Sequence, residues 1–110
     1  MRILVPVDGS AGALRAAKHA AALGTQAGME VVLLNVQPAM PLYGMVRAYM
    51  RESQYREACD ALAKKALDPA ARILKRARVA HRQHVMYGDP GQTIAAAVRD
   101  ARPDIIDVSS

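Results

Sequence analysis

Short apolar runs alternate along the chain with longer segments in which apolar residues recur every three or four positions. The runs at 3–7 and 30–36 are rich in Val, Ile and Leu and predict strands that are buried on both faces. The run at 79–86 mixes apolar and polar residues, which predicts an edge strand, and 104–110 opens a fourth strand. Because helical segments separate the strands, the pattern predicts an α/β fold with a parallel sheet and right-handed crossovers.

The first helical segment, 11–27, is rich in alanine and has clear signals at both ends. Ser10 is a typical N-cap residue, and Gly28 is a typical residue just after a helix. Its small side chains predict a helix that lies close to the sheet.

The second helical segment is predicted to run from about 47 to 77. Pro69 lies inside it, so we expect a kink or a new start there, with Asp68 as the new cap. The spacing predicts an apolar face made of Tyr55, Cys59, Leu62, Ala66, Ile73 and Ala77.

The third helical segment has the strongest start signal in the chain. Asp89 is predicted to cap it, Pro90 suits the first helical position, and Gln92 completes a capping box. Pro103 is predicted to end this helix. Its inward face is predicted to consist of Ile94, Ala95 and Val98.

Length and composition place the chain among globular proteins. With 110 residues, 52% of them hydrophobic and 23% charged, it fits a single domain over 1–110 and excludes disordered, collagen-like and disulfide-rich classes. A single cysteine suits a reducing compartment. The chain start lacks a signal-peptide pattern, and no apolar run reaches membrane-spanning length. We therefore expect a cytoplasmic protein that does not contact membranes.

The formal net charge of +5 is unevenly distributed. Residues 47–84 hold ten Arg or Lys and four Asp or Glu, and the segments 72–78 and 81–84 are the most basic. This density suggests either a nucleic-acid surface or a solvated helix face with cations near its C-terminus. No aromatic residues alternate with the charges, as they would on a base-stacking surface. The pattern favours the solvated face, and nucleic acid is the less expected partner.

The first strand ends in the tetrapeptide at 7–10, which makes this turn a candidate binding site. Ligands of open parallel sheets bind at the carboxyl ends of strands. Asp8 can accept a hydrogen bond from a base amine or a ribose hydroxyl, and Gly9 allows close approach of the backbone. Ser10 opens a helix whose N-terminus favours anions. The alternative is structural, since Asp and Ser are also common turn and cap residues.

Other chemistries find little support in the sequence. A dinucleotide site requires three spaced glycines, and the turn offers only Gly9 and Gly12. His81 and His84 would point to opposite faces of a strand, which disfavours a metal site. Cys59 lies on an apolar helix face with no histidine nearby in sequence, so we expect a core residue rather than a nucleophile. We predict no catalytic residues, no metal and no enzymatic activity.

Four segments of the chain resemble the universal stress protein family. They are the opening Ile-Leu-Val-Pro-Val-Asp-Gly-Ser at 3–10, the strand that ends at Val36, the sequence at 88–90 before Ile94, and the start of the fourth strand at 104–106. The resemblance implies a doubly wound, Rossmann-like sheet, for which we expect the strand order 3-2-1-4. It also implies adenine-nucleotide binding, with ATP or AMP as ligand, dimerisation and a role in stress responses.

The resemblance further implies which residues bind the nucleotide, at the ends of the first and fourth strands. The family's glycine-rich phosphate loop follows the fourth strand, and this chain ends where the loop would begin. We therefore expect a C-terminally truncated fold that lacks that loop, the last helix and the last strand, and that binds triphosphates poorly. We expect the open fourth strand to be covered by a partner chain or to be poorly ordered. The alternative function is an oligomerising module that binds no nucleotide. The implied site residues are Pro6, Val7, Asp8, Gly9, Ser10, Val36, Gly88 and Ser109.

Overall fold

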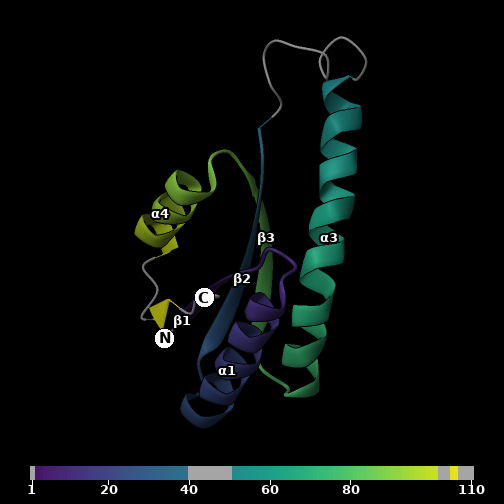
Figure 1. Ribbon diagram of the computed structural model, residues 1–110. Helices are drawn as coiled ribbons and strands as arrows, with labels where there is room; N and C mark the ends of the chain where they lie inside the picture. The colour runs from purple at the N-terminus through teal and green to yellow at the C-terminus, as the bar shows by residue number, and fades with distance from the viewer. Residues whose placement is uncertain (1, 40–50, 102–104, 107–110) are drawn as a thin grey trace.

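The computed structural model describes residues 2–39, 51–101 and 105–106 (Figure 1). A parallel sheet carries helices on both of its faces, which confirms the predicted α/β class. The strands lie in the order β3-β2-β1-β4, and every pair is parallel. The elements are β1 (Arg2–Pro6), α1 (Ala11–Ala27), β2 (Glu30–Gln37), α3 (Glu52–Arg76), β3 (His81–Tyr87), α4 (Pro90–Ala101) and β4 (Ile105–Ile106).

The alternation of side chains along β1 and β2 divides the core into two layers. Ile3 and Val31 point toward α1 and α3, whereas Leu4 and Val32 point toward α4. The helix α1 contributes mostly alanine to the first layer, together with Gly24. A Cβ atom on Gly24 would lie 2.6 Å from a methyl carbon of Val79, so a larger residue at this position would clash with Val79. The alanines of α1 are buried against residues of β1 and β2, as the small-residue face of this helix predicts.

The helix α3 differs from its prediction in two places. Arg51 has extended backbone angles, so the helix begins at Glu52 and the predicted start near 47 is wrong; residues 47–50 themselves lie outside the described part. The helix also continues through Pro69 without a new start, and Asp68 is not a cap. Proline removes one backbone hydrogen bond, and burial of Leu67 and Ala70 on either side of it offsets that loss.

Two helix faces are rotated slightly from their predicted positions. Leu62 is 58% exposed, whereas Cys59 is buried as predicted and Ile73 and Ala77 are partly buried. On α4, Ala95 is exposed and Ala97 packs on the sheet with Ile94 and Val98. A pattern of small residues does not determine which face of the helix is buried, because alanine occurs on both sides of these helices. The buried α3 residues are Cys59, Ala63, Leu67, Ala70 and Leu74.

The predicted edge position of β3 is confirmed, since it pairs only with β2 within the described residues. The strand begins at His81, two residues later than expected, because Val79 belongs to the turn that ends α3, where its N–H donates to the Leu74 carbonyl. Of the fourth predicted strand, the structure describes Ile105–Ile106, and 107–110 lie outside the described residues.

The end of α3 is a Schellman motif with an unusual residue. The Val79 N–H donates to the Leu74 carbonyl at 3.0 Å, and the Arg78 N–H donates to the Lys75 carbonyl at 3.1 Å. This motif places one residue in the left-handed region, and that residue is usually glycine. Here it is Arg78, with φ of 57°. A non-glycine residue in this conformation costs about 1–2 kcal/mol of backbone strain.

We predict that Arg78→Gly raises the free energy of unfolding by about 1 kcal/mol, because glycine removes the strain and keeps the motif. Urea denaturation measures the change. Arg78→Ala removes the same charge but keeps a Cβ atom, so it should leave the stability close to that of the unaltered protein. Equal gains from the two variants would show that charge, not backbone strain, governs this position.

Candidate functional site

A cavity of about 410 Å³ opens at the carboxyl ends of β1 and β2, on the face that carries α4. Its walls are mainly apolar, and among the described residues that line it Asp8 alone is ionisable. Of the predicted site residues, Pro6, Val7, Asp8 and Val36 meet in this cavity. The sequence analysis did not anticipate three of its lining residues. Those three are Leu34, Pro90 and Ile94.

The remaining predicted site residues do not line the cavity. Gly9 and Ser10 follow Asp8 in the turn that leads to α1, and Gly88 lies between β3 and α4. Ser109 lies outside the described residues.

The turn after β1 fixes the Asp8 carboxylate. The Ser10 N–H donates to Asp8 Oδ1 at 2.9 Å, and the Ser10 hydroxyl oxygen accepts from the Ala13 N–H at 3.1 Å as the predicted cap. Gly9 has φ of 86°, a conformation that other residues rarely adopt. Hydrogen bonds from the Ser10 side chain and backbone lower the pKa of Asp8 below its ordinary value of 3.8. At neutral pH the cavity therefore has a negatively charged acceptor at its exposed rim.

Asn35 holds this turn against β2. Its side chain is 3% exposed, and its Nδ2 donates to the Val7 carbonyl at 2.7 Å. Its Oδ1 accepts from Gln37 Nε2, also at 2.7 Å. The sequence contained the signal for this contact, because Asn35 is the one polar residue within the apolar run at 31–36. A buried amide at such a position needs hydrogen-bond partners, and the freed carbonyl at the end of β1 provides one.

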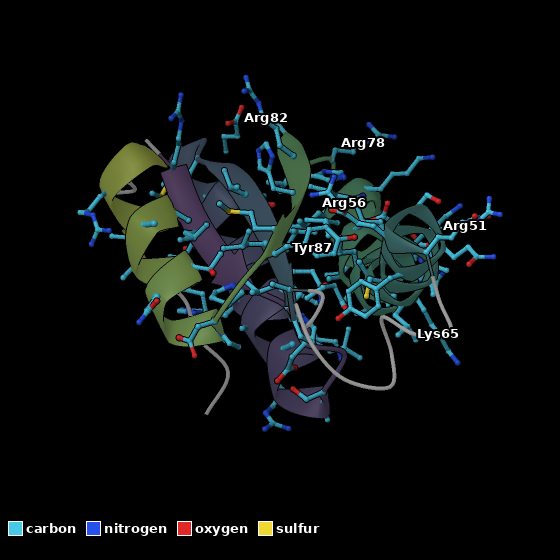
Figure 2. All side chains as sticks on the ribbon, turned by 90° about the horizontal axis from the view of Figure 1, so that it is seen from above. Arg51, Arg56, Lys65, Arg78, Arg82 and Tyr87 are labelled. Carbon is cyan, nitrogen blue, oxygen red and sulfur yellow. The ribbon has the colours of Figure 1, made fainter. Side chains whose placement is uncertain are left out.

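The end of β3 is fastened to α3 by Tyr87. Its hydroxyl donates to the Asp60 carboxylate and lies 3.3 Å from the Arg56 carbonyl oxygen. The Arg56 guanidinium lies 4.9 Å from the centre of the Tyr87 ring, and Figure 2 shows the two side chains together. Desolvation and the neighbouring Asp60 raise the pKa of Tyr87 to about 12. The hydroxyl thus remains a donor throughout the physiological range.

Gly88 follows Tyr87 and turns the chain toward α4. Its N–H donates to the Gln37 carbonyl at 2.9 Å, and a Cβ atom here would lie 2.7 Å from Thr93 Oγ1. The helix then begins as predicted, with Asp89 Oδ1 accepting from the Gln92 N–H at 3.0 Å. Gly88 therefore shapes the turn that brings Pro90 to the cavity.

Among the described residues, the structure gives no support to a metal site or to a cysteine nucleophile. No set of three or more His, Cys, Asp or Glu side chains is placed to hold a metal ion there. His81 Nδ1 lies 2.9 Å from the Val79 carbonyl oxygen, and Cys59 is buried. None of the helices in the described part is long and apolar enough to cross a membrane. The arrangement around Asp8 is one that can bind a ligand.

We predict that Asn35→Leu lowers the free energy of unfolding by about 1–3 kcal/mol, because the Val7 carbonyl and the Gln37 amide lose their partner. Chemical denaturation measures this loss. As a control, Asn35→Asp at neutral pH places a carboxylate against the Val7 carbonyl. Its deficit should shrink as the pH falls, because the protonated acid can donate in place of the amide. Unchanged stability in both variants would contradict the role given to Asn35.

We predict that Ser10→Ala raises the pKa of Asp8 toward 3.8, since the variant loses the hydroxyl hydrogen bond. The Asp8 carboxyl chemical shift, followed by NMR against pH, measures the change. Because folding lowers this pKa, the associated stabilisation is complete above about pH 4 and is lost as the pH falls through the folded value. Ser10→Thr keeps a hydroxyl and should titrate like the unaltered protein; a Thr variant that titrates like Ala would count against this cause.

The fold has close structural relatives. A protein of the universal stress protein family from Burkholderia pseudomallei is 23% identical, with a TM-score of 0.79, over 99% of this chain and 80% of its own. A universal stress protein family protein from Arabidopsis thaliana, solved with AMP bound, is 19% identical with a TM-score of 0.74, over 100% and 76%. The universal stress protein from Archaeoglobus fulgidus in complex with dAMP is 21% identical with a TM-score of 0.72, over 98% and 79%.

Sequence comparison gives a result at the level of the family. A search of curated proteins found no significant match. The model of the universal stress protein family matches residues 1–110, which is the whole chain. Fold and family model agree with the four segments noted in the sequence, and the chain belongs to the universal stress protein family.

Proposed function

We propose that the protein is a stress-response module that binds an adenine nucleoside or its monophosphate in the cavity beside Asp8. The observation that carries this proposal is an apolar cavity with one charged acceptor at its rim, at the carboxyl ends of two adjacent parallel strands. Ligands of open α/β sheets bind at this place. The volume of about 410 Å³ lies within the range of small-molecule sites.

The walls of the cavity suit a flat aromatic base. Val36 and Ile94 come from β2 and α4, and Pro6 at the end of β1 adds its ring to the lining. A purine gains free energy by leaving water for such surfaces. Asp8 accepts from a ribose hydroxyl or from the adenine amine, since both are donors and the carboxylate is ionised at neutral pH.

The charges around the cavity favour a ligand with few phosphates. None of the described residues that line it is Lys or Arg, and Asp8 and Asp89 place two carboxylates at or next to its wall. One first-turn N–H of each neighbouring helix is also occupied, that of Ala13 by the Ser10 hydroxyl on α1 and that of Gln92 by Asp89 on α4. A triphosphate would gain no cation from the described lining and would be repelled by both carboxylates. We therefore propose adenosine or AMP, rather than ATP, as the ligand.

The structural relatives support this choice of ligand. The Arabidopsis and Archaeoglobus proteins were solved with AMP and dAMP, which are adenine monophosphates. Within the proposal, the implied contacts at Gly9, Ser10, Gly88 and Ser109 remain predictions. Cytoplasmic location, assembly into a homodimer and the lack of catalytic activity remain predictions too.

We predict that isothermal titration calorimetry detects adenosine and AMP binding, with ATP binding more weakly. Asp8→Asn should weaken AMP binding at least about tenfold, because it removes a charged hydrogen-bond acceptor. Glu57→Gln, which makes the same chemical change on the exposed face of α3, should leave the affinity unchanged.

Two results would overturn the proposal. The first is absence of heat and of thermal stabilisation with all three ligands at millimolar concentration. Such a result, combined with a dimer in analytical ultracentrifugation, would support the oligomerising module instead. The second is tightest binding of ATP, which would show that phosphates rather than base and ribose are recognised.

A further inference from the structure

Cationic side chains gather at the end of the molecule opposite the cavity. The last turns of α3, the following turn and the start of β3 meet there (Figure 1). No Asp or Glu occurs in the sequence between Asp68 and Asp89. We call this surface the basic end, and it consists of Arg72, Lys75, Arg76, Arg78 and Arg82, all exposed.

Most of these cations have no neutralising partner in the part of the chain that the structure describes. The described ion pairs at this end join Arg82 to Glu30 at 3.5 Å and Arg2 to the same carboxylate at 3.8 Å. One carboxylate thus faces two guanidinium groups. Figure 2 shows Arg78 and Arg82 extending into solvent on one side of the molecule, while Lys65 points away on another side of α3.

The fold explains only part of this charge. Lys75 and Arg76 lie in the last turn of α3, where cations favour the helix C-terminus. Arg78 has the opposite effect on stability, because it holds the left-handed position of the Schellman motif, which glycine would fill without strain. A strained residue at an exposed basic surface is an observation that points to function rather than to folding.

The chemistry of the surface selects the partner. A protein interface needs buried apolar anchors, and the exposed large hydrophobic residues of the described chain, Leu62 and Val85, lie away from the α3–β3 turn. Single-stranded nucleic acid binds through bases that stack on aromatic side chains. The described tyrosines, Tyr55 and Tyr87, contact Pro38 and Asp60 instead, toward the end of the molecule opposite the basic end. The phosphate backbone of a double helix requires only spaced cations.

We propose that the basic end binds the phosphate backbone of double-helical nucleic acid without reading its base sequence. Arg72 and Arg76 are one helical turn apart, about 6 Å along the axis, and Arg78 follows in the turn that ends α3. This surface includes no residue of the cavity lining, so the two sites are at opposite ends of the strands. The inference is therefore independent of adenine binding.

The test uses fluorescence anisotropy with a labelled 20-base-pair DNA duplex of mixed sequence, between 50 and 200 mM salt. With four or five phosphate contacts we expect log K to fall against log salt with a slope of about −4. The variant Arg72→Gln/Lys75→Gln/Arg76→Gln should lose at least about tenfold in affinity, and its slope should become shallower by about 2 to 3. The control Arg15→Gln/Lys18→Gln/Lys65→Gln has the same net charge and removes exposed cations elsewhere, so it should lose less than about threefold.

Arg78→Gly separates binding from folding. It should weaken duplex binding severalfold while raising the melting temperature, and no general loss of structure gives that pair of signs. The proposal is overturned if the two triple variants lose affinity equally, if Arg78→Gly binds like the unaltered protein, or if the duplex does not bind at 50 mM salt. Polyglutamate that competes as well as unlabelled duplex would identify an acidic protein as the partner and would also overturn it.

Discussion

The hydrogen bond from the buried Asn35 amide to the Val7 carbonyl is the contact on which the rest of the site depends. A parallel strand that ends in a turn leaves backbone groups without sheet partners, and water cannot reach them here. Asn35 supplies the missing donor from the neighbouring strand, and Val7 donates in turn to the Leu34 carbonyl at 2.7 Å. The end of β1 is therefore held in place, and Asp8, the next residue, occupies a fixed position at the rim of the cavity. A polar atom in the core thus defines where the ligand-binding chemistry can occur.

The sequence predicts most of the fold because the physical signals for strands and helix ends are local. Runs of branched apolar residues locate β1 and β2. Ser10 and Asp89 mark helix starts through hydrogen bonds to near neighbours, and Gly28 ends α1 in the left-handed conformation. The errors in the predicted helix faces arise where contacts between residues distant in sequence determine which side chains are buried. Leu62 looks like a core residue by spacing, yet the sheet meets α3 along another line, and Leu62 faces solvent.

The candidate site is less predictable than the fold for the same reason. Asp8 follows from its position after a strand, because the ends of parallel strands are a common place for ligands. The contribution of Ile94 depends on where α4 crosses the sheet, and no local pattern encodes that crossing. Asn35 is an intermediate case: its polarity in an apolar run is visible in the sequence, but its partner Val7 is 28 residues away. Sequence reasoning could have flagged the residue without identifying the bond.

The position of Cys59 has a practical consequence. It is the only cysteine in the chain, it is 6% exposed, and it lies on the buried face of α3. A thiol reagent can reach it only when α3 separates locally from the strands below. Its rate of alkylation therefore reports how often that separation happens. Cys59 is thus a built-in, single-site probe for local opening of α3.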